Sequence, residues 1–225
     1  SIQDIIEKYE KNFPNDVNFE DFAKYNTIQL NDTHPVMAIP EMMRVLMDDK
    51  KLSWKQAWNV TSNVFNYTNH TILQEAMEKW SVDVVEEVSP RIMDIIAEID
   101  RRFVSDLVGL YYSVDRIDNL RIVKDNTVNM AHLAILTAVK INGVAKIHTE
   151  ILKNETLKSW HDLYPDKFVN KTNGITPRRW LFYANPELTQ YITELLGEDW
   201  KTDLTKLKEL EKFRDDDNVL DRLMA

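Results

Sequence analysis

Two short polar segments of this chain carry residue types that suit the recognition of a small polar ligand. "NDTHP" places Asp32 and His34 directly after the strand candidate "TIQL", and "TNHT" places Asn69 and His70 directly after "VFNY". Together they offer neutral amides, imidazoles and one carboxylate, so hydrogen-bond donors and acceptors lie close together. Such a set suits a polyhydroxylated ligand better than an apolar one.

Each of these residues also has a structural interpretation. Asp32 is a suitable N-cap for a helix that begins between Val36 and Pro40. His34 precedes a proline, which restricts its backbone to extended conformations and is typical of a turn. His70 could be a buried, hydrogen-bonded histidine. The functional hypothesis therefore depends on the shared character of the two segments and on no single position.

Other groupings give weaker signals. Asp32 and His34 with His70 could ligate zinc, but the chain has no HExxH motif, and we expect no metal site. Glu75 and Glu78 lie one helical turn apart and could form an acid/base pair of the glycosidase kind. Carboxylates at this spacing are common on exposed faces, so we interpret Glu78 as solvated surface.

Composition restricts the class of protein. The 225 residues carry a formal net charge of −9, which removes the electrostatic attraction that dominates nucleic-acid binding. No apolar run approaches the roughly 20 residues that a membrane-spanning helix needs. The first residues lack the apolar stretch of a signal peptide, and the absence of cysteine fits a reducing compartment. We therefore expect a cytoplasmic protein that binds neither nucleic acid nor membranes, so its Asn-x-Thr triplets are not glycosylation sites.

Helical signals dominate the chain from about Ile39 onward. The strongest is "SPRIMDIIAEIDRRFVSDLVGL", where Ser89 is the expected N-cap and apolar residues follow at helical spacing. A capping box predicts another helix after Ser53, and cap-plus-proline pairs predict helices after Thr176 and Asn185.

Strand candidates are few and short, at residues 25–30, 63–67 and 143–147. The segments between them are long enough for helical crossovers, so we expect parallel pairing and a mostly helical α/β fold. Ligands of open parallel sheets bind beyond the carboxyl ends of the strands. If the first two strands are neighbours, the two polar segments face one cavity. A domain boundary is expected in the polar stretch 170–180.

Five segments also carry a family resemblance. They are "NDTHPVMAIPEMMRVLMD", "YTNHTILQEAMEKW", "SPRIMDIIAEIDRRF", "VNMAHLAILTAVKINGVAKIHTEIL" and "KFVNKTNGITPRRWL". In order and spacing they closely resemble the middle of the α-glucan phosphorylases, the family of glycogen, starch and maltodextrin phosphorylase. The resemblance extends from about Thr27 to Leu196.

The resemblance implies a fragment of a larger enzyme. Members of the family have two Rossmann-like domains of the GT-B type that face a cleft. Residues 1–170 would be the C-terminal part of the N-terminal domain, and 171–225 the crossover into the C-terminal, cofactor-binding domain. The family uses pyridoxal 5′-phosphate and inorganic phosphate to cleave terminal α-1,4-glucosidic bonds of glucans, which gives glucose 1-phosphate. A homodimeric parent protein is also implied.

The resemblance assigns roles to matching positions. His70 would contact the 6-hydroxyl of the transferred glucose, and Asn173 would hydrogen-bond its 4- and 6-hydroxyls. Asp32 and His34 would line the acceptor side of the pocket, and Glu75 would line the same pocket.

Three further positions belong to this set. Asn69 and Thr71 would bind substrate with the rest of "TNHT", and Trp180 would pack near the cofactor. The family's Schiff-base lysine lies in a motif that resembles "TGNMKFMLNG", and its phosphate-binding cluster in one that resembles "KRIHEYKR"; neither occurs in this sequence. We therefore expect the fragment alone to be inactive and to bind no cofactor. The alternatives are a glycoside hydrolase and a non-catalytic carbohydrate-binding module.

Overall fold

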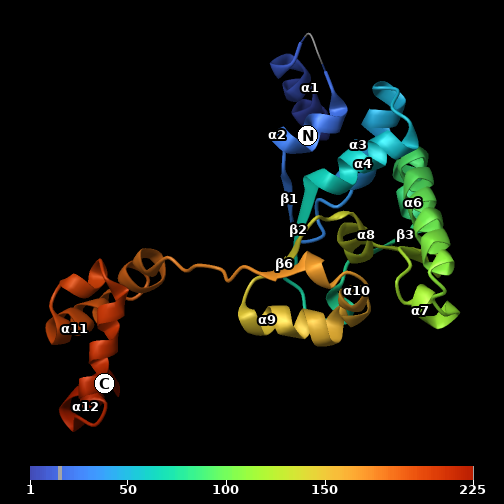
Figure 1. The fold of residues 1–225 in the computed structure, drawn as a ribbon. Helices are drawn as coiled ribbons and strands as arrows, with labels where there is room; N and C mark the ends of the chain where they lie inside the picture. Colours follow the sequence, from blue (N-terminus) through green and yellow to red (C-terminus); the bar gives the residue numbers. More distant parts are fainter. Residues whose placement is uncertain (15–16, 225) are drawn as a thin grey trace. The chain divides into compact units, whose positions relative to one another are not determined.

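The computed structural model describes residues 1–14 and 17–224 and forms two compact units (Figure 1). The first is Ser1–Asn173 and the second is Gly174–Ala225. The division between them falls inside the polar stretch 170–180. No helix among the described residues is long and apolar enough to cross a membrane.

A four-stranded parallel sheet organises the first unit. Its strand order is β1 (Ile28–Asn31), β2 (Phe65–Thr68), β6 (Ile141–Gly143) and β7 (Phe168–Asn170). The expected strands at 25–30 and 63–67 correspond to β1 and β2, each displaced toward its carboxyl end. Parallel pairing and a mostly helical α/β fold are confirmed.

The strand predicted at 143–147 is wrong. Strand β6 ends at Gly143, and α9 (Lys146–Ile151) begins three residues later. The reason is a close approach between strand and helix. A Cβ atom at Gly143 would overlap Thr149 Oγ1 and lie 2.9 Å from Thr149 Cα. Only a glycine allows the chain to turn this tightly from the sheet into the helix.

A second, antiparallel sheet was not predicted. It contains β3 (Lys79–Ser81), β5 (Thr127–Asn129) and β4 (Val123–Lys124), in that order. Asp125 and Asn126 join the last two strands with φ values of 50° and 55°. These left-handed values are typical of a two-residue type I′ hairpin, and asparagine and aspartate adopt them most readily after glycine.

Helices surround the parallel sheet. Two sequence predictions are confirmed: the capping box of Ser53 with Gln56 begins α4, and Pro90 begins α6. The α-helices of the first unit are α1 (Ile2–Asn12), α2 (Phe22–Tyr25), α3 (Ala38–Arg44), α4 (Trp54–Val64), α5 (Val82–Val88), α6 (Pro90–Gly109), α7 (Val114–Asp118), α8 (Met130–Thr137), α9 and α10 (Lys158–Leu163). Shorter helical segments are η1 (Phe19–Asp21), η2 (Val45–Asp49), η3 (Gln74–Ala76), η4 (Leu152–Thr156) and η5 (Pro165–Lys167).

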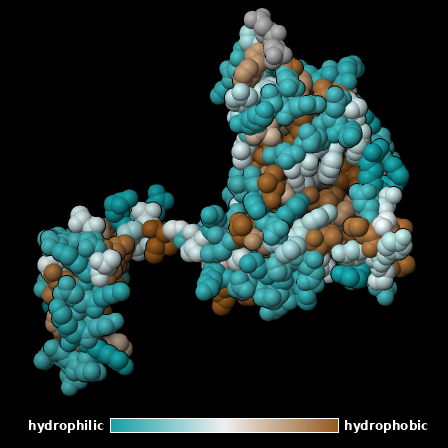
Figure 2. Space-filling model, viewed as in Figure 1, coloured by the Kyte–Doolittle hydropathy of each residue, from teal (hydrophilic) through white to brown (hydrophobic). Residues whose placement is uncertain are grey.

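One apolar core lies between the sheet and these helices. It includes Phe65 and Tyr67 of β2 and Ile96 of α6, all completely buried. On the face shown in Figure 2 the surface is mostly hydrophilic, with smaller hydrophobic patches among the hydrophilic residues. Burial of the apolar helix faces against the sheet is therefore the main source of stability in this unit.

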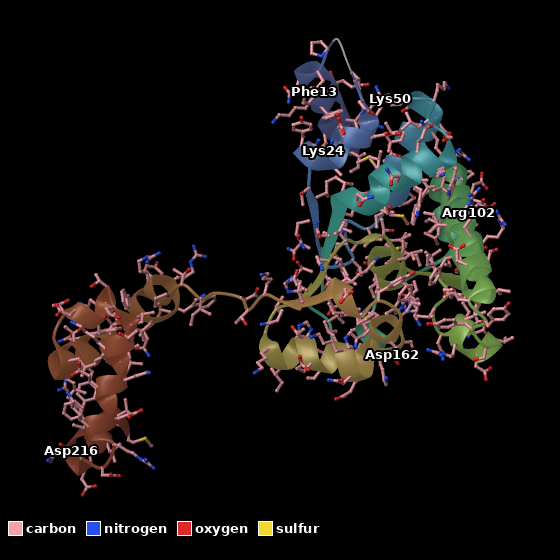
Figure 3. The ribbon with its side chains drawn as sticks, viewed as in Figure 1. Phe13, Lys24, Lys50, Arg102, Asp162 and Asp216 are labelled. Carbon is pink, nitrogen blue, oxygen red and sulfur yellow. The ribbon has the colours of Figure 1, made fainter. Side chains whose placement is uncertain are left out.

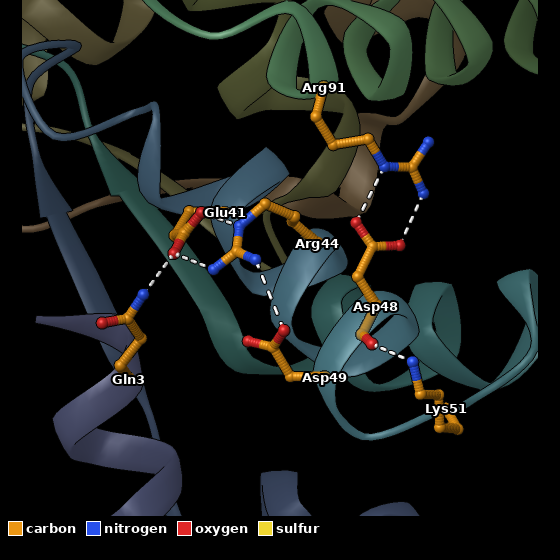
Figure 4. A network of polar contacts seen from close by, with 7 residues as sticks. All are labelled: Gln3, Glu41, Arg44, Asp48, Asp49, Lys51 and Arg91. Atoms are coloured by element: carbon orange, nitrogen blue, oxygen red, sulfur yellow. Dashed lines mark hydrogen bonds and ion pairs between the residues drawn. The ribbon is translucent and has the colours of Figure 1, made fainter.

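Ion pairs join helices that are distant in sequence. Arg91 of α6 holds both carboxylate oxygens of Asp48 in η2, at 2.8 and 2.7 Å (Figure 4). In the same network Arg44 binds Glu41, which also accepts a hydrogen bond from Gln3 of α1. A separate pair joins Lys50, which is labelled in Figure 3, to Glu10 of α1.

The second unit is helical throughout its described part. Its elements are η6 (Arg178–Tyr183), α11 (Pro186–Leu196), η7 (Asp199–Lys201), η8 (Leu204–Phe213) and α12 (Asp217–Met224). The predicted helix after Asn185 is confirmed, because the Asn185 side chain accepts from Leu188 N. The helix predicted after Thr176 is also present, as one helical residue at Pro177 followed by the π-helical η6.

Candidate functional site

The two polar segments meet at the carboxyl edge of the parallel sheet. Strands β1 and β2 pair in register up to Asn31 and Thr68, and Asp32 N donates to Thr68 O at 2.9 Å. Asn69 N then donates to Asn142 O of β6 at 3.0 Å. The predicted neighbourhood of the two strand ends is therefore confirmed, and a third strand ends beside them.

Asp32 connects the two segments. Its Oδ2 atom accepts from His70 N at 3.1 Å and from Thr71 Oγ1 at 3.2 Å, while Oδ1 accepts from Thr33 N at 2.6 Å. Its φ of 62° lies in the left-handed region, which aspartate tolerates better than most residues. The alternative role as the cap of α3 is wrong, because Met37 precedes that helix and no side chain caps it.

His70 lies on the surface of this edge. Its side chain is exposed, so the interpretation as a buried histidine is wrong. Nε2 forms a hydrogen bond of 2.7 Å with Asn31 Oδ1, the last residue of β1. This bond occupies one ring nitrogen, and no other residue that the structure describes forms a hydrogen bond with Nδ1.

Asn69 shapes the bend between β2 and the following segment. Its side chain is completely buried, with Oδ1 accepting from Thr71 N at 3.0 Å and Nδ2 donating to the Tyr67 hydroxyl at 3.0 Å. Burial raises the pKa of Tyr67, so this phenol stays protonated. Both polar ends of the Asn69 amide are thus used within the protein, and we infer that it orients the segment.

An open cavity of about 710 Å³ lies at this edge. Asp32, His34, Thr71 and Glu75 contribute to its wall, whereas Asn69 and His70, which were expected to face the same cavity, are not among the described residues that line it. Its lining offers carboxylates, an imidazole and a hydroxyl, which can hydrogen-bond the alternating donors and acceptors of a sugar. Among the described residues, no group of three or more His, Asp or Glu side chains has a metal-binding arrangement.

Glu78 was expected to be solvated surface, but both of its carboxylate oxygens accept hydrogen bonds. Its Oε2 accepts from Thr33 Oγ1 at 2.6 Å, and its Oε1 accepts from Trp80 Nε1 at 2.8 Å. It is therefore not a freely solvated side chain, and it joins the first polar segment to β3. Sequence spacing gave no signal for this, because the partners of Glu78 include a residue 45 positions away.

Asn173 lies beside the end of β6. Its backbone N–H donates to Val144 O at 2.8 Å, and its side chain is exposed. The first unit thus brings three strand ends and Asn173 together. Trp180 belongs to the second unit, where its side chain is 68% exposed.

His148 of α9, which the sequence suggests is structural, is a buried neighbour of the site. It is 5% exposed, and its Nδ1 accepts from Val144 N at 3.0 Å. Burial is the main cause that lowers its pKa, and the nearby charge of His70 lowers it further. The imidazole is therefore held neutral. Its position, 78 residues after His70 in the sequence, gave no signal of this proximity.

Comparison with known proteins extends these observations. The family described as carbohydrate phosphorylase matches residues 1–225. The liver form of glycogen phosphorylase from Homo sapiens is 47% identical over 209 residues, covering 91% of this chain and 25% of the relative. The H isozyme of alpha-glucan phosphorylase from Vicia faba is 45% identical over 225 residues, covering 97% of this chain and 27% of the relative.

The muscle form of glycogen phosphorylase from Homo sapiens is 45% identical over 226 residues, covering 96% of this chain and 27% of the relative. The chain thus spans about a quarter of the length of the curated relatives it matches. Relatives from an animal and a plant agree in kind, and the family match includes both compact units. The chain therefore belongs to the carbohydrate phosphorylase family.

Proposed function

We propose that this chain is part of an α-glucan phosphorylase, which transfers the terminal glucose of an α-1,4-glucan to inorganic phosphate and yields glucose 1-phosphate. The observation that carries the proposal is the Asp32 carboxylate, which joins two polar strand ends around one open cavity. The membership in the carbohydrate phosphorylase family supports the same reaction.

The proposal includes the architecture of the parent protein. Residues 1–170 form the C-terminal part of an N-terminal Rossmann-like domain, and 171–225 cross into a second such domain of a GT-B arrangement. The parent is a homodimer, and this chain alone is inactive. The coverage of about a quarter of each relative supports the view that a longer protein carries the remaining catalytic groups.

Within this enzyme the chain positions the sugar. His70 contacts the 6-hydroxyl of the glucose that is transferred, and Asn173 contacts its 4- and 6-hydroxyls. Asp32 and His34, with Glu75, line the acceptor side of the cavity. Thr71 and Asn69 complete the segment that holds His70. These residues transfer no proton themselves, but correct orientation of a reacting group can lower a barrier by several kcal/mol.

Carbohydrate phosphorylases generally depend on pyridoxal 5′-phosphate. The described residues do not form a site for this group. Trp180, the residue that we propose to lie near it, is largely exposed and offers only an indole N–H. The sequence also lacks a counterpart of the lysine-containing motifs that would anchor the cofactor and bind phosphate. We therefore derive no step through the cofactor from this chain.

A glycoside hydrolase is less well supported. Such an enzyme needs two carboxyl groups free to act on the glycosidic bond and on water. Both oxygens of Glu78 already accept hydrogen bonds from Thr33 and Trp80, so Glu78 is a poor partner for Glu75 in acid/base catalysis. No observation favours hydrolysis over phosphorolysis.

The products of the intact protein test the proposal. The protein is incubated with maltoheptaose in phosphate buffer and, as a matched control, in sulfate buffer of equal ionic strength. We expect glucose 1-phosphate in phosphate and no sugar release in sulfate. Free glucose at equal rates in both buffers would favour a hydrolase. Saturable maltoheptaose binding without any product would favour a carbohydrate-binding module.

A further inference from the structure

Helix α9 carries a histidine, His148, that is linked through Val144 to Asn173 and lies near Thr71 of the other segment proposed to bind the sugar. His148 accepts the N–H of Val144 at its Nδ1, at 3.0 Å. The carbonyl of the same Val144 accepts from Asn173 N at 2.8 Å. Two hydrogen bonds, both made by Val144, therefore connect His148 to the backbone of Asn173.

His148 also lies near "TNHT". Because Nδ1 accepts a hydrogen bond, the neutral imidazole must carry its hydrogen on Nε2. This Nε2 atom is buried and forms no complete hydrogen bond. The backbone of Thr71 lies close enough to influence its protonation, as do the charges of Asp32 and His70. A buried N–H without an acceptor destabilises the arrangement that contains it.

The position of the ring is fixed by its helix. Thr149, the next residue, donates to Asn170 Oδ1 of β7 at 2.9 Å. On its other side it packs so closely on Gly143 that no Cβ fits between them. The helix is thus held to two strands, and a small movement of the Thr71 backbone is the easier way to complete the bond to Nε2. Hydrogen bonds of this kind are often poorly aligned in unliganded sites and tighten when ligand binds.

We propose that His148 is a positioning residue that connects the backbone of Thr71 with that of Val144 and Asn173, and that sugar binding completes its Nε2–H bond to the Thr71 carbonyl. The inference rests on the proposed function, since it takes both segments as sugar contacts. It assigns His148 no contact with substrate. By forming this bond, His148 stabilises the arrangement that the two segments adopt with bound sugar relative to their arrangement without sugar.

Two substitutions separate the two sides of the ring. His148→Asn keeps an acceptor near the position of Nδ1 for Val144 N–H but cannot reach Thr71. His148→Phe fills the space and removes both polar atoms. The matched control is His132→Asn, which changes another histidine with a low pKa whose Nδ1 contacts Arg121 O, away from the cavity.

The test measures KM for maltoheptaose, KM for phosphate and kcat in the intact protein, with maltoheptaose binding by calorimetry and the melting temperature. For His148→Asn we expect KM and Kd for maltoheptaose to rise about five- to tenfold, as for one lost hydrogen bond, with KM for phosphate unchanged. His148→Phe should weaken maltoheptaose binding further. His132→Asn should lower only the melting temperature.

The outcomes distinguish the two proposals. If both His148 variants lose thermal stability like the His132 control but keep sugar affinity within twofold, the positioning role is wrong. If the unmodified protein forms no glucose 1-phosphate, phosphorolysis is wrong, while calorimetry still decides the role of His148. Equal weakening of sugar and phosphate would also overturn the inference, because it would indicate a general disturbance of the fold.

Discussion

Two polar regions of the first unit differ in burial and in how completely their groups are paired within the protein. Asp100 of α6 is 2% exposed and accepts hydrogen bonds from Arg121 and from the N–H groups of Ile122 and Val123. At the strand ends, Asp32 is only half-buried, and its neighbours His34 and Glu75 face an open cavity. The carboxylate of the first region is hydrogen-bonded within the protein, whereas the second region has donors and acceptors that face the open cavity.

This difference distinguishes structural from functional polar groups. A fully buried carboxylate that accepts from backbone N–H groups stabilises the fold, because its removal leaves those N–H groups without an acceptor. A carboxylate that holds a binding segment contributes less to stability and more to the geometry of the bound ligand. Substitutions in the two regions should therefore separate stability from activity.

The largest effect on stability is expected for Asp100→Ala. Two backbone N–H groups, those of Ile122 and Val123, lose their acceptor. We expect the free energy of unfolding to fall by about 3 kcal/mol, measured by urea denaturation. Phosphorolysis per folded molecule should stay unchanged. Asp100→Asn, which keeps one oxygen, is the milder control. Loss of activity in a stable Asp100→Asn protein would contradict the purely structural role of Asp100.

His132 should make the same region sensitive to acid. Burial lowers the pKa of His132 from 6.5 to about 4, so the unfolded chain binds its proton first as the pH falls. Stability from this group is present above pH 6.5 and declines below it. We expect a loss of about 2 kcal/mol in the free energy of unfolding between pH 8 and pH 5.

Denaturant unfolding at several pH values measures the effect of His132. His132→Asn does not titrate, so its stability should vary less over the same range by about that amount. His148 has a lowered pKa too and contributes with the same sign in both proteins, which cancels in the difference. Equal pH dependence of both proteins would show that His132 is not held neutral.

The smallest effect on stability is expected for Asp32→Asn. Asparagine tolerates the left-handed backbone at this position but accepts less strongly from His70 N and Thr71 Oγ1. We expect the free energy of unfolding to change by about 1 kcal/mol or less, while kcat/KM for maltoheptaose falls about tenfold or more. Asp32→Gly suits the backbone conformation but removes the hydrogen bonds from His70 N and Thr71 Oγ1. It should lower kcat/KM for maltoheptaose further. Retained activity in both variants would remove Asp32 from the proposed site.

The sequence was sufficient to predict that the two polar segments lie together at one edge of the sheet. Parallel strands end at one edge, so the polar residues after β1 and β2 had to be near one another if the strands were neighbours. Periodicity and the Ser89-Pro90 pair likewise predicted the long helix α6. These features depend on residues that are close together along the chain.

Features that depend on tertiary packing were missed. The end of β6 is set by the contact of Gly143 with Thr149 across a turn, and not by the alternation of residues in "GVAKI". The environment of His148 and the partners of Glu78 come from segments far away in the sequence. Strands of two or three residues, as in the second sheet, are too short to give a periodic signal.

The Asp125-Asn126 turn has a consequence for the order of folding. It joins β4 and β5 within two residues, whereas β1 and β2 pair across 33 intervening residues and β2 and β6 across 72. Hairpins form within microseconds, and closing long loops costs more entropy. We therefore expect backbone amides of the hairpin to gain protection from hydrogen exchange before those of the parallel sheet. The edge that we propose to bind sugar would then be among the last parts of this unit to form.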